Sequence, residues 1–352
     1  MEIKKELKDI ALDITEPQYR AMPELSYSNL STFERLGYDG LDHLFDKIES
    51  PSLTFGSAVD TILTDGVDEF NDKFIVLDIN ITDSGMEICK KLAEWNKQNN
   101  NYYENFGGIP VDIVSNIAKS VGFWQADKWD KRRYSEVLKT GDVTAYYHTL
   151  VNSDKIVIDT ATYNDVIACV KALRESQATS GLFADNDEMS PIRRYYQLKF
   201  RATLDGVGYR NMMDLVICDY EDKIIYPYDL KTCGIPEWHF EDNFLKFHYY
   251  TQARLYYRIL EDNVRRDHYF KDFEIKNFKF IVINRKTLTP LVWEFPLTKE
   301  YGDLIDDNGN IHKDPFDIGK ELRGYLDLKP PVPNGIDLTG INTITCLKKI
   351  NA

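Results

Sequence analysis

Three β-rich runs follow one another closely in the second half of the chain and constrain its fold more than any other feature. They span residues 193–204, 208–220 and 223–233, and turn residues separate them at Asp205 and Gly206 and again at Glu221 and Asp222. Each run is rich in β-branched and aromatic residues, as strands are. Runs joined by such short turn signals are typical of hairpins. The pattern therefore predicts an antiparallel meander.

Helical patterns precede and follow these runs. Before them, apolar residues recur at helical spacing, with turn residues between the segments. After them, the order is helix, two strands and helix. We expect an α/β core of residues 151–352, including a C-terminal tail, and an N-terminal helical region of residues 1–150, although the two could form one domain. The predicted elements are helices near 53–66, 84–140, 161–179, 241–263 and 316–328, and strands near 73–79, 276–285 and 290–297.

The composition fits an ordered globular protein. With 352 residues, of which 43% are hydrophobic, the chain can bury one large core or two modest ones. No apolar run approaches the roughly 18 residues that a membrane span needs, and the N-terminal segment is charged where a signal peptide would be apolar. We therefore expect a cytoplasmic protein without membrane contact.

The five cysteines are scattered along the chain without CxxC spacing. This distribution argues against a zinc ribbon, an iron–sulfur cluster and a disulfide framework, so we expect reduced thiols. They are Cys89, Cys169, Cys218, Cys233 and Cys346.

A net charge of -14 would ordinarily count against a nucleic-acid partner, because Lys and Arg supply the affinity for phosphates. Net charge is a sum, however, and local basic groups exist at 131–133, 193–194 and 246–266. They could line a positive groove on an acidic body, or they could be ordinary solvated surface charges.

One short segment places a carboxylate and an amine on the same surface. Side chains alternate faces along a strand, so Asp229 and Lys231 point to one side and Leu230 to the other. If the second run pairs with the third across its turn, Asp214 can sit opposite Asp229. Two carboxylates and a backbone carbonyl suit Mg²⁺ or Mn²⁺, and a lysine can orient the attacking water or stabilise charge on a phosphate. The alternative is an ordinary surface ion pair.

The helix that follows supports the catalytic interpretation. Gln252 and Tyr256 lie four residues apart and so project from one helical face, with Tyr249 beside them. Neighbouring apolar residues on this helix form a stripe that can pack against the sheet.

Three segments, by their order and spacing, resemble those of the PD-(D/E)XK nucleases. Among these nucleases the resemblance is to the branch that contains the RecB nuclease domain and the RecE-like exonucleases of phages and prophages. The segments are MMDLVI around Asp214, YPYDLKT around Asp229 and Lys231, and HYYTQARLYYRIL with Tyr249, Gln252, Leu255 and Tyr256. The resemblance implies a restriction-endonuclease-like core, a mixed sheet of four or more strands flanked by helices. It also implies that Asp214, Asp229 and the Leu230 carbonyl hold Mg²⁺, for which Mn²⁺ can substitute. Lys231 would then assist the attacking water, while Gln252, Tyr256 and Tyr249 position DNA.

A fainter similarity lies nearer the N-terminus. YSNLSTFERL resembles the family's first helix, and SPSLTFGSAVDTIL resembles a segment that normally ends in a metal-binding histidine. Asp60 occupies that position and is either a further oxygen ligand or a solvent-facing helix residue. Met213 replaces the proline of the family name, Gln197 stands where an acidic residue is expected, and the cysteines of cluster-bearing relatives are missing. The resemblance therefore implies no iron–sulfur cluster.

The resemblance suggests a Mg²⁺-dependent DNA exonuclease in phage-type recombination, replication or repair. Its partners would be DNA and a recombination or single-strand annealing protein, and its location the host cytoplasm if the chain is phage-encoded. Two alternatives stay open. One is an endonuclease acting on branched or foreign DNA, and the other is an inactive, nuclease-derived protein that binds DNA or a partner.

Overall fold

The computed structural model describes residues 3–45 and 50–327, and they form two compact units. Of the described residues, the sheet unit comprises 3–45, 50 and 172–327, and the helical unit comprises 51–171. The sequence predicts a division near residue 150, whereas in the structure residues 3–45 belong with the strands. The reason is packing, because helix α2 (Tyr27–Leu36) contacts helices α11 (Tyr249–Arg266) and α12 (Pro315–Asp327).

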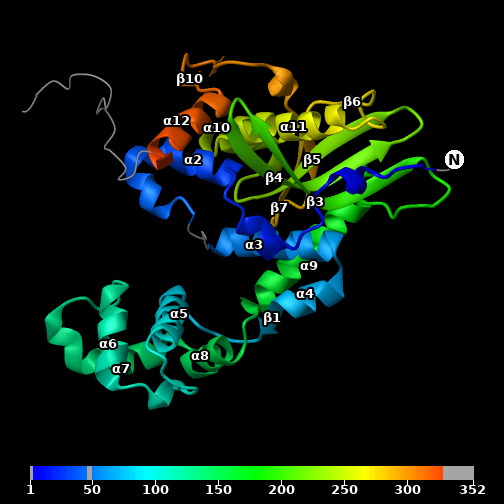
Figure 1. Ribbon diagram of the computed structural model, residues 1–352. Helices are drawn as coiled ribbons and strands as arrows, with labels where there is room; N and C mark the ends of the chain where they lie inside the picture. Colours follow the sequence, from blue (N-terminus) through cyan, green and yellow to red (C-terminus); the bar gives the residue numbers. More distant parts are fainter. Residues whose placement is uncertain (1–2, 46–49, 328–352) are drawn as a thin grey trace, which may run out of the picture. The chain divides into compact units, whose positions relative to one another are not determined.

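The sheet unit is built on a mixed six-stranded sheet (Figure 1). Its strands are β3 (Ile192–Leu204), β4 (Val207–Asp219), β5 (Ile224–Cys233), β6 (Glu274–Ile275), β7 (Lys279–Asn284) and β8 (Leu291–Glu294). The order is β3-β4-β5-β7-β8, with the short β6 also paired to β5. Pairing is antiparallel from β3 to β5, parallel between β5 and β7, and antiparallel again between β7 and β8. The predicted meander and the predicted α/β class with a mixed sheet are confirmed.

Helix α11 forms the centre of the helical layer on this sheet. It packs against β3 and β4, and α2, α10 (Phe240–Lys246) and α12 lie around it (Figure 1). Alanine, leucine and tyrosine side chains of α11 are buried in one large apolar core with residues of the sheet. The single helix expected over 241–263 is wrong, because the chain breaks at His248. That residue adopts a left-handed backbone conformation with φ of 56° and precedes α11 as its N-cap.

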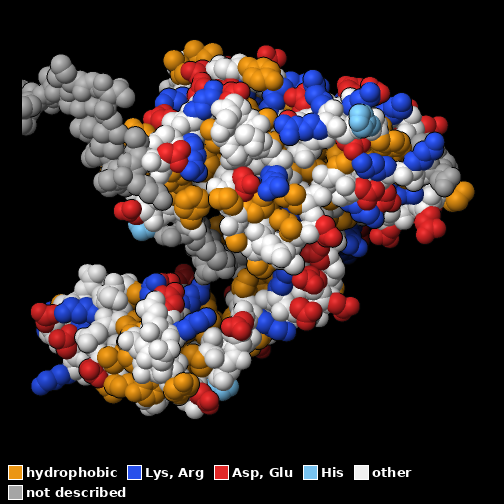
Figure 2. Space-filling view, viewed as in Figure 1, with side chains coloured by type: hydrophobic (Ala, Val, Ile, Leu, Met, Phe, Trp, Pro, Cys, Tyr) orange, Lys and Arg blue, Asp and Glu red, His pale blue; other side chains and the backbone are white. Residues whose placement is uncertain are grey.

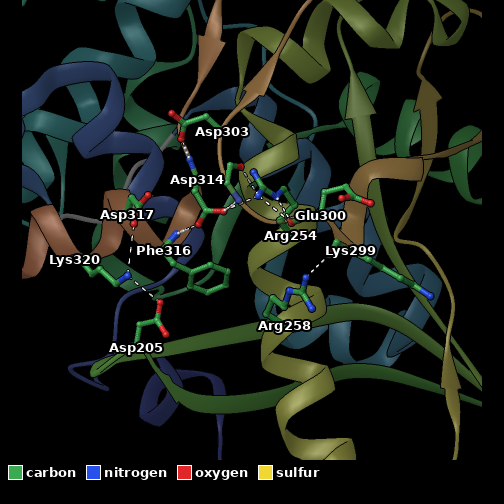
Figure 3. A network of polar contacts seen from close by, with 11 residues as sticks. Asp205, Arg254, Arg258, Lys299, Glu300, Asp303, Asp314, Phe316, Asp317 and Lys320 are labelled. Carbon is green, nitrogen blue, oxygen red and sulfur yellow. Dashed lines mark hydrogen bonds and ion pairs between the residues drawn. The ribbon is translucent and has the colours of Figure 1, made fainter.

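Two arginines attach the segment 299–314 to α11 (Figure 3). Arg254 is 1% exposed, forms an ion pair of 2.7 Å with Asp314, and donates to the carbonyl oxygens of Glu300 and Gly302. Arg258 donates to the carbonyl oxygen of Lys299. A buried guanidinium needs such acceptors, because burying an unpaired charge is costly. The segment that precedes α12 is thereby fixed to the core.

Smaller elements complete the sheet unit. They are η1 (Leu7–Ile10), α1 (Glu16–Arg20), η2 (Gly37–His43), η6 (Glu237–His239), η7 (Pro296–Lys299), β9 (Leu304–Ile305) and β10 (Ile311–His312).

The helical unit contains one small parallel pair of strands, β1 with β2, among helices. Its core gathers apolar side chains of α5, α6 and α8, among them Ile88, Val114 and Tyr147. The helix expected near 53–66 is present and begins at Pro51. The elements are α3 (Pro51–Thr64), α4 (Val67–Lys73), β1 (Phe74–Leu77), α5 (Asp83–Gln98), η3 (Phe106–Gly108), α6 (Val111–Ser120), η4 (Asp127–Trp129), α7 (Asp130–Val137), η5 (Leu138–Thr140), α8 (Val143–Asn152), β2 (Ile156–Asp159) and α9 (Thr160–Glu175). The last residues of α9, 172–175, belong to the sheet unit.

Surface and thiol properties follow from this architecture. None of the helices in the described ranges is long and apolar enough to cross a membrane. Cys89, Cys169, Cys218 and Cys233 are buried, while Cys346 lies outside the described residues. Burial raises the pKa of Cys89 and of Cys218 to about 12. On the face of the sheet unit in view, basic, acidic and apolar side chains are interspersed (Figure 2).

Candidate active site

The candidate site lies where β5 separates from β4. The ladder between these strands runs from Asp219 and Ile224 to Leu215 and Tyr228, and the next rung would place Asp214 opposite Asp229. Tyr228 pairs with both β4 and β7, and from Asp229 onward β5 pairs with β7 and no longer with β4. The Asp214 side chain bridges this divergence, since its Oδ2 accepts a hydrogen bond of 2.9 Å from the backbone nitrogen of Leu230.

Asp229 and Lys231 project from β5 on the same side, as the alternation of a strand requires. The Lys231 Nζ lies 2.6 Å from the Asp229 Oδ2. Asp229 is only 3% exposed, and the Lys231 side chain is 17% exposed. This pair is therefore not the ordinary surface ion pair of the alternative interpretation. Both side chains of the pair are therefore largely buried.

Gln252 holds the second oxygen of the Asp229 carboxylate. Its Nε2 donates a hydrogen bond of 2.6 Å to the Asp229 Oδ1, and the side chain is 4% exposed on α11. The amide orientation follows from chemistry, because a carboxylate can only accept from the NH₂ group. Within the described residues, the Gln252 Oε1 has no hydrogen-bond partner. Gln252 and Lys231 together fix the plane of the carboxylate.

Aromatic rings form one wall beside the lysine. The Lys231 Nζ lies 4.6 Å from the ring centroid of Tyr249, a cation–π contact. Tyr249 in turn stacks on Phe240 and Phe280, each at 5.8 Å between centroids. The ring of Tyr27 lies 6.4 Å from that of Tyr249. These contacts restrict the directions in which the ammonium can move.

Lys231 keeps its charge in this setting. Burial alone would lower the pKa of the amine, but the negative charge of Asp229, with smaller contributions from Tyr249 and Asp214, opposes it. The net result is a pKa for Lys231 above its ordinary value of 10.5. At neutral pH the group is therefore an ammonium that donates hydrogen bonds, and it does not act as a base.

The backbone of β3, which pairs with β4 on the side away from β5, is distorted opposite Asp214. In the register between β3 and β4, Tyr196 pairs with Leu215 and Leu198 with Met213, so Gln197 faces Asp214 at a rung that the ladder omits. Gln197 has a φ of 52°, in the left-handed region. A non-glycine residue held there costs about 1–3 kcal/mol, and such strain clusters at functional sites. The ladders on both sides of β4 are thus interrupted at Asp214.

The two remaining predicted site residues, Tyr256 and Asp60, lie on helices. Tyr256 lies one turn after Gln252 on α11, is 8% exposed, and packs edge-on against Phe278. Its hydroxyl has a pKa raised by burial and by the charges of Tyr19, Asp229 and Asp214. Asp60 lies half-buried on α3, in the helical unit. The substrate-binding role of Tyr256 and the ligand role of Asp60 stay predictions.

Tyr27 is a site neighbour that the sequence analysis missed. Its hydroxyl donates to the carbonyl oxygen of Phe247, and burial raises the pKa of that hydroxyl although Lys231 opposes the rise. The only sequence signal was the segment YSNLSTFERL, which begins with Tyr27 and which we identified as a helix without assigning a role to its first residue.

The donor set fits a divalent cation such as Mg²⁺. Within the residues described, no group of three or more His, Cys, Asp or Glu side chains could hold a metal on its own. Mg²⁺ does not require such a group, because it is usually bound by one or two carboxylates and keeps several waters. Asp214, Asp229 and the Leu230 carbonyl supply hard oxygen ligands of that kind.

Comparisons with known proteins add little to this geometry. No protein-family model and no curated protein matches the sequence. Seven chains of solved structures match, among them the crystal structure of "Putative exonuclease" from Eubacterium rectale. That chain is 12% identical, with a TM-score of 0.39, and the match covers 90% of this chain and 84% of the other.

Proposed function

We propose that this chain is a Mg²⁺-dependent nuclease that hydrolyses phosphodiester bonds in DNA. One observation carries the proposal: the carboxylates of Asp214 and Asp229 and the ammonium of Lys231 gather where β5 leaves β4. The Asp214 carboxylate accepts a hydrogen bond from the backbone nitrogen of Leu230, and the Asp229 carboxylate is ion-paired with Lys231. Two carboxylates and a fixed cation beside them are the groups that phosphodiester hydrolysis needs.

Each side chain has a distinct role in this proposal. Asp214, Asp229 and the Leu230 carbonyl would hold the cation. When bound, Mg²⁺ would lower the pKa of a coordinated water and neutralise charge on the phosphate. Lys231 donates hydrogen bonds to the attacking water or to a phosphate oxygen, because its amine is charged. Gln252 is a positioning residue that acts through Asp229.

The substrate and mode of action come from the sequence resemblance. The three segments resemble those of a branch in which exonucleases of recombination and phage replication predominate. We therefore propose an exonuclease acting in such processes, with a recombination or annealing protein as a partner. The roles of Tyr249 and Tyr256 would be to position the DNA strand near the scissile phosphate.

A nuclease assay with a matched pair of variants tests the proposal. End-labelled double- and single-stranded DNA is incubated with the wild type, Asp214→Asn or Asp219→Asn, in Mg²⁺ or in chelator. Asp219 lies on the same strand, and its Oδ1 accepts from the backbone of Glu221 and Asp222, which asparagine can also do. Only Asp214→Asn should abolish cleavage. Equal cleavage by Asp214→Asn and the wild type would refute the proposal.

Linear and covalently closed circular DNA distinguish exonuclease from endonuclease. An exonuclease requires an end and leaves the closed circle intact. If the wild type cuts the closed circle in Mg²⁺ and Asp229→Ala does not, the protein is an endonuclease and the exonuclease proposal is wrong.

A specific observation favours an inactive, nuclease-derived binding protein as the second candidate. Gln197 stands at the position where the family has an acidic residue, and both oxygens of Asp229 already contact side chains. Such a protein would bind labelled DNA in a filter-binding or gel-shift assay without shortening it in Mg²⁺ or Mn²⁺.

A further inference from the structure

The loop between α6 and α7 in the helical unit presents aromatic side chains to solvent. Trp124 is 36% exposed, Trp129 is partly exposed, and their ring centroids lie 4.8 Å apart at an angle of 66°. Phe123 stacks beside Trp124 at 6.2 Å. Trp124 also has a φ of 49°, in the left-handed region. A bulky residue rarely adopts this conformation unless the surrounding structure imposes it.

A buried arginine imposes that conformation. Arg133 is fully buried and donates to the Trp124 carbonyl oxygen through Nε at 3.0 Å and Nη2 at 2.9 Å. It also donates to the Ala126 carbonyl oxygen at 3.3 Å and to the Ser115 Oγ at 2.8 Å. One guanidinium thus ties the loop to the preceding helix, so the exposed rings are held in place before any ligand arrives.

The charges around the rings have a positive excess. Residues 119–139 contain six Lys or Arg and three Asp or Glu, in a chain whose net charge is -14. All three acidic side chains are ion-paired within this segment: Asp127 with Lys119, Asp130 with Arg133 and Glu136 with Lys139. The other three cations are exposed and have no ion pair in the described part of the chain; they are Lys128, Lys131 and Arg132.

The unpaired cations lie next to the rings in sequence, and one lies next to them in space. The Lys128 Nζ is 5.0 Å from the ring centroid of Trp129. Lys131 and Arg132 follow on the first turn of α7. Exposed aromatic rings beside cations are the two components with which proteins bind single strands, because bases stack on the rings and phosphates contact the cations. Duplex DNA offers its bases only at the edges, so it matches this surface less well.

We propose that this aromatic and basic surface, formed by Trp124, Lys128, Trp129, Lys131 and Arg132, binds a single-stranded polynucleotide without sequence preference. The bases stack on the two tryptophans, and the phosphates pair with the three cations. The binding does not depend on the nuclease activity proposed above, because the surface belongs to the helical unit and uses none of the candidate site residues.

Fluorescence anisotropy of a labelled 20-mer of oligo-dT, with the full chain in chelator, tests this proposal. We expect Trp124→Ala and Trp129→Ala each to weaken binding about tenfold, because each change removes a ring on which one base stacks. A Lys131→Gln, Arg132→Gln double variant should reduce the slope of log K against log salt by about 1.4, since each phosphate contact to a single strand contributes about 0.7.

The controls separate this surface from other sites. Trp238, 52% exposed in the sheet unit, serves as the matched tryptophan, and Trp238→Ala should bind like the wild type. Thermal unfolding of each variant checks its fold, and the Lys131 and Arg132 changes are surface substitutions that leave the loop intact. A labelled oligo-U of equal length reports whether RNA binds by the same stacking.

Unchanged affinity and salt slope in folded variants of all three kinds would overturn the proposal and leave a protein partner as the occupant. Failure of the nuclease proposal appears elsewhere, as a lack of Mg²⁺-dependent cleavage by a protein that still binds oligo-dT through Trp124 and Trp129.

Discussion

The chemistry of the candidate site depends on one amine whose surroundings keep it charged. The carboxylate of Asp229 contacts Lys231 directly, and Tyr249 lies against the ammonium. Because these groups raise the pKa above 10.5, the charge persists across the physiological range. The role of Lys231 is therefore electrostatic, as a fixed donor to a developing negative charge.

The pH dependence of cleavage follows from the direction of this shift. A pKa raised in the folded state means that the stabilising contribution of Lys231 is complete below pH 10.5 and is lost only as the pH rises through the folded-state pKa. We expect kcat to show no descending limb caused by Lys231 up to about pH 10. A loss of kcat between pH 7 and 9 that Lys231→Arg removes would contradict this assignment.

Gln252 can be tested as a positioning residue. Replacing it by alanine leaves the Asp229 Oδ1 without its donor, so the carboxylate is less well oriented. Changes of this kind next to a metal ligand typically cost about 10–100-fold in metal affinity or activity. We expect Gln252→Ala to need more Mg²⁺ for half-maximal cleavage. An unchanged Mg²⁺ requirement with a reduced kcat would point instead to direct contact with the substrate.

The sequence predicted the site residues that lie within one strand or face each other across one turn. Strand alternation brought Asp229 and Lys231 together, and the short turn brought Asp214 near them. The same logic could not identify Tyr27, because its approach to Tyr249 depends on packing between segments more than two hundred residues apart. Helical spacing showed the face on which Gln252 lies but not that its amide would contact Asp229.

At the scale of elements, the strands were easier to predict than the helix boundaries. Turn residues mark the ends of β3, β4 and β5 in the sequence, whereas residues 240–266 contain neither glycine nor proline. The break at His248 is instead a tertiary effect. The His248 Nδ1 lies 2.5 Å from the Glu34 Oε2, on a helix from the other end of the chain, and 2.9 Å from the Tyr250 hydroxyl. These contacts accompany the left-handed turn that starts α11.

The attachment of α11 to the segment before α12 carries a stability prediction. Arg254→Met leaves the Asp314 carboxylate, 7% exposed, without its cation in the core. Removing one partner of a buried ion pair typically costs about 3–5 kcal/mol. Urea unfolding should show a loss of this size for Arg254→Met. On the same helix, Arg265 is 72% exposed, so Arg265→Met should change the free energy of unfolding by less than about 0.5 kcal/mol. Equal losses for the two variants would contradict this account of the network in Figure 3.

At the scale of the whole molecule, composition indicated an ordered globular protein and the order of the predicted elements indicated the α/β class, but neither showed the division of the chain. The described residues up to 50 and from 172 to 327 form one unit although 121 residues separate them, and no linker-like sequence marks either junction. Local patterns report neighbours in sequence, so the return of the chain to its first helices was not accessible. The net charge of -14 likewise did not indicate the basic excess around Trp124 and Trp129 in the helical unit, of which the sequence showed only the group at 131–133.

The central claim is that Asp214 and Asp229 hold one divalent cation at the divergence of β4 and β5. Calorimetric titration of the full chain with Mn²⁺ tests it without relying on cleavage. We expect the wild type and Asp219→Asn to bind Mn²⁺ alike, and Asp214→Asn and Asp229→Asn each to lose that binding. If all four proteins give the same isotherm, the two aspartates do not form the metal site and the nuclease mechanism built on them is wrong.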